Sequence, residues 1–296
     1  MTNAINLSLL PAPDVVQALD YETVLEEMLT DLRSRSSEFT VLVESDPAYK
    51  ILEVAAYREI LLRQRVNDAA RSVMVAYAVG TDLDNLAALF GIKRQIIEAG
   101  DPEAIPPIPT VFEDDERLRS RIPLSLEGYS TAGPVGAYVY HTLAASGEVK
   151  DVAVTSPSPG EVIVTVLSIY ANGVPDAALL QTVTERLNHE DIRPLTDPVT
   201  VQGVEIVEYS ITASLTFYNG PDKAIVAEQA RAKVTEYATQ QHKLGFDVTL
   251  SGLYAALHQP GVQNVVITSP ANDIVIQNHQ AAFATSIKVS EGGLDE

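Results

Sequence analysis

The amino-acid sequence predicts an α+β protein with a helical bundle region, a proline-rich arm, and two related α/β subdomains with mainly antiparallel strands. Three observations lead to this prediction: a helical period of apolar residues before position 80, strict apolar and polar alternation near position 210, and a nine-residue repeat. The expected boundaries are residues 1–95 for the helical bundle region, 96–127 for the arm and a short helix, 128–203 for the first subdomain and 204–296 for the second.

The clearest helix is expected between Asp46 and Gly80. Asp46 can accept amide hydrogens of the first turn, Pro47 suits the first helical position, and Gly80 suits a left-handed C-terminal cap. Such a helix is about 50 Å long, more than a small domain needs for its own core. Arg58 interrupts an apolar seam along one face. The seam consists of Ile51, Ala55, Leu62, Val66, Ala69, Val73 and Ala76.

The seam needs a helical partner, and two partners fit it. One is a helix of another chain. The contact residues expected for that helix are Leu62, Val66, Ala69, Val73 and Ala76. The other is the preceding helix of this chain, which Asp20 can cap. Its apolar side carries Val24, Leu25, Met28 and Leu32.

A further short helix is predicted from Leu83 to Phe90. Thr81 and Asp84 resemble a capping box at its start, and Gly91 is placed to end it. With the two preceding helices, it completes a bundle or half of one.

The arm is predicted from the segment GDPEAIPPIP at residues 100–109, whose four prolines bar both a regular helix and a central strand. We interpret it as a linker or extended arm, with contact to a neighbouring chain as the alternative. A short helix follows, with acids at residues 113–116 and then Arg117, Arg119 and Arg121. The helix dipole accounts for this order without a binding site.

The second half of the chain changes to alternating strands and helices. Residues 207–217 alternate between apolar and polar side chains, which predicts a strand with one buried and one exposed face. The sequence YNGPD at residues 218–222 indicates a turn, followed by a helix through about Tyr237.

The repeat consists of VKDVAVTSP at residues 149–157 and VQNVVITSP at residues 262–270, with five of nine residues identical and Asp151 matched to Asn264. Each copy follows a predicted helix and precedes a predicted strand, which favours a duplication. The helices are residues 135–145 and 250–258, and the strands are residues 161–167 and 273–277.

Composition excludes several kinds of partner. The formal net charge of −20 argues against nucleic acid. The absence of cysteine excludes disulfides, thiol nucleophiles and cysteine-ligated metals. No segment predicts membrane insertion, and the first residues carry no basic charge as a secretory signal would, so we expect assembly in the cytoplasm of the producing cell.

The sequence offers no catalytic, cofactor-binding or metal-binding motif. No histidine lies three or four residues from another, and no phosphate-binding or nucleophile-elbow pattern occurs. The cluster of His189, Glu190 and Asp191 is interpreted as a solvated helix end before Pro194, with a metal site as the weaker alternative. We therefore predict no enzyme and no cofactor.

Several segments, in order along almost the whole chain, resemble the baseplate J-like protein family. They are LPAPDVVQALDYETVLEEM from residue 10, AYREILLRQRVNDAARSVMVAYAVGTDLDNLAALFGI from 56, EGYSTAGPVGAYVYHTLAASGEVKDVAVTSPSPGEVIVTVLS from 127, LNHEDIRPLTDPVTVQGVEIVEYSITASLTFYNGP from 187 and LGFDVTLSGLYAALHQPGVQNVVITSP from 244.

This resemblance implies a structural wedge protein in the baseplate of a contractile phage tail or tail-like bacteriocin. In that family, paired J-type copies join one I-type wedge protein through a helical bundle, and six wedges surround the central spike hub. The ring holds the sheath initiator and tail fibres and relays the contraction trigger to the sheath. The alternatives are a cell-wall- or carbohydrate-active tail enzyme and the equivalent wedge protein of a type VI secretion baseplate.

Overall fold

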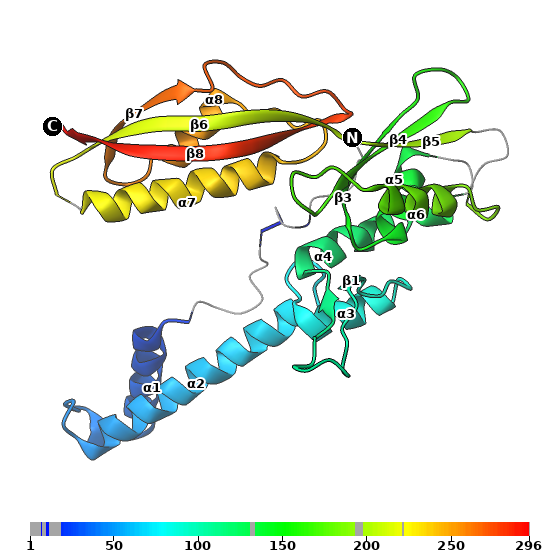
Figure 1. Ribbon diagram of the computed structural model, residues 1–296. Coiled ribbons are helices and arrows are strands. Elements are labelled where there is room, and N and C mark those ends of the chain that lie inside the picture. The colour runs from blue at the N-terminus through cyan, green and yellow to red at the C-terminus, as the bar shows by residue number, and fades with distance from the viewer. Residues whose placement is uncertain are drawn as a thin grey trace. The chain divides into compact units, whose positions relative to one another are not determined.

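The computed structural model describes residues 7, 10–11, 19–130, 134–192, 198–220 and 222–295 (Figure 1). Helices combine with one antiparallel and two mixed sheets, which confirms the predicted α+β class. The described residues fall into two compact units. The helical unit ends at Arg94 and resumes for Asp114–Ile122, whereas the α/β unit holds Gln95–Glu113 and continues from Pro123. Among the described residues, no helix is both long and apolar enough to cross a bilayer.

The helical unit contains the predicted N-terminal helices. Asp20 caps the first of them as expected, because its carboxylate accepts the Glu22 N–H at 3.3 Å. The last shows the predicted charge order, with Asp115 and Glu116 in its first turn and Arg121 in its last, matching the helix dipole. The elements are α1 (Tyr21–Arg35), η2 (Ser37–Phe39), α2 (Pro47–Ser72), α3 (Gly80–Ala88) and most of α4 (Asp115–Leu124).

Helix α2 begins where predicted, with Asp46 as its N-cap residue and Pro47 in its first turn, but the expected cap bond and the predicted end need correction. The Asp46 carboxylate makes no cap bond to the helix and instead accepts the Val43 N–H of the preceding loop at 2.9 Å. At the other end the helix stops at Ser72. Gly80 has a left-handed φ of +55°, but it begins α3 and does not cap α2.

A long-range contact explains why α2 ends early. The Arg119 guanidinium of α4 donates to the carbonyl oxygens of Val75 at 2.9 Å and Ala78 at 2.7 Å. In a continuing helix those oxygens would accept the N–H groups four residues further on. The buried arginine therefore satisfies the carbonyl groups of a turn that has left the helix.

Helix α3 is shifted from its predicted range of Leu83–Phe90, and the expected capping box is wrong. It begins at Gly80, whose N–H donates to the Asp115 carboxylate at 3.0 Å, while the Asp84 carboxylate binds Arg94 at 2.8 Å and caps no backbone group. The helix ends at Ala88, two residues before the predicted Phe90, but the predicted terminating role of Gly91 is confirmed. Gly91 has a φ of +71°, and the Ile92 N–H donates to the Ala87 carbonyl at 3.1 Å, a bond of the Schellman motif.

The predicted arm is a β-hairpin and not an extended linker. Strands β1 (Ile96–Glu98) and β2 (Val111–Phe112) pair antiparallel, and Asp101 and Ile108 exchange two backbone hydrogen bonds of 2.9 Å nearer the tip. Gly100 is required, because a Cβ there would lie 2.5 Å from the Thr110 nitrogen. Residues 100–109 therefore double back within the hairpin and do not form the predicted linker.

The first α/β subdomain has a three-stranded sheet in the order β3-β4-β5. Strand β4 pairs antiparallel with β3 and parallel with β5. Its core joins valines of β3 and β4, including Val149, Val164 and Val166, to leucines and valines of the two helices. The elements are η3 (Glu127–Tyr129), α5 (Val135–Ala145), β3 (Val149–Thr155), β4 (Val162–Ser168), α6 (Ala177–Leu187) and β5 (Val199–Gly203).

The second subdomain has the sheet order β7-β6-β8, again with one antiparallel and one parallel pairing to the central strand. The predicted alternation is confirmed in β6, where Ile211, Leu215 and Phe217 are among the buried residues. Figure 1 shows α7 running alongside this sheet. The elements are β6 (Glu205–Phe217), α7 (Lys223–Gln241), α8 (Leu250–Leu257), β7 (Val262–Ser269) and β8 (Gln280–Leu294).

The repeat forms equivalent edge strands, β3 and β7. Both carry an irregularity at the same point, where Asp151 or Asn264 accepts the next residue's N–H at 2.9 Å. The connections differ, because β4 follows β3 whereas the central strand β6 precedes β7. The predicted strand at residues 273–277 is wrong: that segment makes only the isolated bridge of Ile274 to Val248.

The two subdomains share a small core at their junction. Leu167 and Val204 are buried with Leu244 and Ala281. The second carboxylate oxygen of Asp151 accepts the Leu244 N–H at 2.9 Å, and burial raises the pKa of this carboxyl. This cross-subdomain bond explains why the first copy of the repeat needs two acceptor oxygens where the second copy has an asparagine.

Candidate functional site

Helix α2 presents two apolar faces, and α1 covers one of them. Leu52, Ala56 and Ile60, spaced by four residues, belong to the same cluster as the buried Val24 and Leu25 of α1. Each large apolar side chain buried in this way contributes about 1.5–3 kcal/mol. We call this surface, made by Leu52, Ala56 and Ile60, the closed face.

The other face remains exposed over its whole length, and we call it the open face. Leu62 is 64% exposed, Val66 56% and Ile51 68%, although a soluble helix usually turns such residues toward a core. The open face consists of Ile51, Val54, Leu61, Leu62, Val66 and Ala69.

The structure places the five predicted contact residues in two groups. Leu62, Val66 and Ala69 share the open face, as their spacing of four and three residues requires. Val73 is the C-cap and Ala76 lies in the following turn, so neither continues the helical seam. The alternative in which α1 covers the seam is wrong, because α1 contacts the closed face. Contact of the seam with another chain stays a prediction.

Sequence reasoning missed two members of the open face. Val54 and Leu61 are 62% and 40% exposed. Each precedes a predicted seam residue, Ala55 or Leu62, and lies 100° from it around the helix. A pattern limited to steps of three and four leaves out these flanking positions, whereas a wider apolar stripe would have included them.

Two arginines interrupt the apolar surface. Arg58 and Arg65 lie seven residues apart, which places them on the same side of the helix, and both are exposed. Neither forms an ion pair with another residue in the described part of the chain. By contrast, Arg63 lies nearer the closed face and pairs with Glu59 and, at 3.9 Å, with Glu27 of α1.

The charge of α2 differs from that of the whole chain. It carries a formal charge of +2 within a protein of −20. Its basic residues are Lys50, Arg58, Arg63, Arg65 and Arg71, and its acidic residues are Glu53, Glu59 and Asp68. A basic, apolar helix face in an acidic protein favours an acidic partner.

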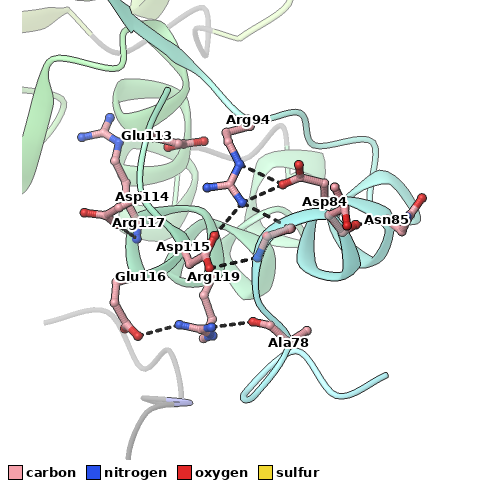
Figure 2. A network of polar contacts seen from close by, with 12 residues as sticks. Ala78, Asp84, Asn85, Arg94, Glu113, Asp114, Asp115, Glu116, Arg117 and Arg119 are labelled. Carbon is pink, nitrogen blue, oxygen red and sulfur yellow. Dashed lines mark hydrogen bonds and ion pairs between the residues drawn. The ribbon is translucent and has the colours of Figure 1, made fainter. Parts of the chain in front are cut away.

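A polar network fixes the end of the open face (Figure 2). Arg94 donates to Asp84 of α3 and, at 2.7 Å, to Asp115 of α4, while the other Asp115 oxygen accepts the Gly80 N–H at 3.0 Å. Arg119 joins the same helix to the turn after α2 and pairs with Glu116 at 2.6 Å. The turn after α2 is thereby held between α3 and α4.

The electrostatics of the network favour charged groups. The Gly80 N–H and the Arg94 guanidinium hold the pKa of Asp115 below its ordinary value of 3.8. Burial works against the charge of Arg94, but Asp84 and Asp115 outweigh it and raise the pKa of that guanidinium. Arg94 and Asp115 are thereby favoured in their charged forms, and their contacts connect α3 to α4.

Outside the open face and the polar network, the described residues offer only weak candidates for a metal or catalytic site. His189 lies 3.4 Å from Asp191 with both side chains mostly exposed, which fits the solvated helix end, while Pro194 lies outside the described residues. Within the described ranges, no three histidine or acidic side chains are grouped as a metal site requires. His141 and His242 are partly buried, and burial lowers the pKa of each.

Comparisons with known proteins match nearly the whole chain. Three family models match it in order: the baseplate J-like N-terminal domain at residues 44–101, the central domain at 130–203 and the C-terminal domain at 209–290. Baseplate protein J of Escherichia phage P2 is 48% identical over 299 residues, covering 99% of each chain.

A solved structure shows a weaker similarity. The cryo-EM structure of the anti-feeding prophage baseplate contains a chain that is 14% identical, with a TM-score of 0.41. The alignment covers 62% of this chain and 44% of that one, so this chain matches less than half the length of its neighbour. Family membership therefore rests on the sequence matches and not on this structural similarity.

Proposed function

The chain belongs to the baseplate J-like family, and on that premise we propose that it is a structural wedge component of a contractile-tail baseplate. The single observation that supports a role in assembly is the open face of α2. In the proposed particle, wedges surround the central spike hub, carry the sheath initiator and tail fibres, and relay the contraction trigger to the sheath.

The open face supplies the contact surface that such a role needs. Burial of an exposed leucine, isoleucine or valine gains about 1.5–3 kcal/mol. Several such gains are needed to offset the freedom lost when two chains associate. Ile51, Leu62 and Val66 provide them along one helix. The proposed occupant of the open face is a helix of an I-type wedge protein, with a further copy of this chain in the same wedge.

The residue pattern of the open face favours assembly over catalysis. A catalytic site requires reactive groups that converge in a recess. The open face has apolar side chains on the outside of a single helix. We accordingly place the function of this surface in binding other baseplate chains, in a phage tail or a tail-like particle.

Co-expression with the I-type wedge protein tests the proposal. The double variant L62D/V66D places two carboxylates on the open face, and we expect it to lose co-purification while keeping its circular dichroism spectrum. The matched control is V41D/I105D, which alters side chains that are 82% and 99% exposed and belong to segments outside α2. Retention of the I-type protein by L62D/V66D, or equal loss in the control, would count against the proposal.

A further inference from the structure

We propose that the open face of α2 binds an acidic amphipathic helix of another polypeptide, whose carboxylates pair with Arg58 and Arg65. This inference rests on the proposed function, because it defines the chemistry of the partner for the same surface. It also gives a role to Arg58, which otherwise only interrupts the apolar seam.

The two arginines are placed for recognition. They lie two helical turns apart among Leu61, Leu62 and Val66, all exposed. Within the part of the chain that the structure describes, neither has an ion-pair partner. A helix that buries the leucines brings its own flanking residues to the arginines, and a carboxylate there avoids leaving a desolvated charge unpaired.

Charge argues against a second copy of α2 as the partner for this face. In a parallel pair Arg58 would face Arg58, and in an antiparallel pair it would face Arg65, so both arrangements oppose like charges. An acidic helix converts each of these contacts into an attraction.

Length favours a helix over the acidic hairpin of a second copy. The hairpin tip combines Asp101 and Glu103 with Ile105, whose exposed fraction is 99%, and so has matching chemistry. From Ile51 to Ala69, however, the open face extends about 27 Å. The hairpin reaches only about 13 Å from Asp101 to its tip at Ile105, given roughly 3.3 Å per extended residue.

Two synthetic peptides test the inference on the full chain. Both are amphipathic helices of about 21 residues with the same leucine stripe, and they differ only in having glutamate or lysine at the flanking positions. We expect the wild type to bind the glutamate peptide about tenfold more tightly, since two exposed ion pairs and the opposing repulsions together approach 1.4 kcal/mol. Fluorescence anisotropy at about 0.15 M salt, where charges more than about 8 Å away are largely screened, measures both affinities.

Charge reversal provides the decisive variant. R58E/R65E should invert the peptide preference, whereas the control R71E should leave it unchanged, because Arg71 lies roughly 140° around the same helix from Arg58. The inference is overturned if R58E/R65E still prefers the glutamate peptide. It is also overturned if the wild-type chain binds neither peptide and dimerises instead.

The variant L62D/V66D, which disrupts the apolar part of the open face, separates this inference from the proposed function. If both peptides bind the wild type equally and L62D/V66D releases both, the open face is a helix-binding surface and only the acidic partner is wrong. If L62D/V66D releases neither peptide, the surface itself is wrong and the proposed function loses its main support.

Discussion

The two faces of α2 have similar apolar residues but opposite environments. Ala56 on the closed face is fully buried beneath α1, whereas Leu62, six residues along, is 64% exposed. Arg63 beside the closed face is paired, whereas Arg58 and Arg65 have no ion-pair partner in the described chain. The closed face packs against α1 within the helical unit, whereas the open face leaves its apolar and charged groups exposed.

Under the proposed function, the closed face of α2 determines the stability of the chain and the open face determines its assembly. Substitutions on the closed face should act on the isolated chain, because they remove contacts that already exist. Substitutions on the open face should act only when a partner is present, because they change a surface that water covers in the free chain. Leu25→Ala and Leu62→Ala test this division, and Arg119→Ala and Asp115→Asn test the network that follows α2.

The largest effect is expected from Leu25→Ala on α1, opposite the closed face. Leu25 is 4% exposed, so the substitution removes buried methyl groups and leaves a cavity. We expect the helical unit to lose about 2–5 kcal/mol of unfolding free energy. Hydrogen exchange in α1 and α2 measures this loss. Unchanged protection would mean that α1 does not cover α2 as described.

The next effect is expected from Arg119→Ala, which bears on where α2 ends. The variant removes the donors to the Val75 and Ala78 carbonyls, one of them in a buried hydrogen bond. Leaving such groups without a partner costs about 1–3 kcal/mol. Urea denaturation should show the loss, and exchange should rise at residues 73–79. Arg71→Ala, an exposed arginine near the helix end, serves as the control.

A smaller, pH-dependent effect is expected from Asp115→Asn. The folded pKa of Asp115 lies below its ordinary value of 3.8, so its ionised form stabilises the fold above that pH. This contribution is lost as the pH falls through the lower, folded value. Melting temperatures measured from about pH 5 to pH 2 should therefore fall less steeply for the variant. If the melting temperatures of the wild type and the variant fall in parallel with pH, the Asp115 carboxylate does not contribute to the pH dependence of stability.

The smallest effect is expected from Leu62→Ala on the open face. Leu62 is already 64% exposed in the free chain, so unfolding free energy should change by no more than about 0.5 kcal/mol. The same variant should weaken binding of the glutamate peptide. A loss of stability comparable with that of Leu25→Ala would erase the distinction between the two faces.

Local sequence patterns predicted much of this fold. The start of α1 at Asp20, the turn at Gly91 and the alternation of β6 were all predicted correctly. In each case the determining interactions lie within a few residues, because a helix cap, a left-handed turn and a strand period are set by neighbouring backbone and side chains. The apolar period likewise indicated an interacting face that includes Leu62 and Val66.

The remaining features depend on contacts between distant residues. Arg119 meets the Val75 carbonyl across 44 positions, and Asp151 meets Leu244 across 93. The sequence by itself determined that α2 is amphipathic and that an asparagine or aspartate occupies each copy of the repeat. Only the tertiary structure decided where α2 stops, which face α1 covers and why residue 151 uses two oxygens, because these depend on partners that the fold brings together.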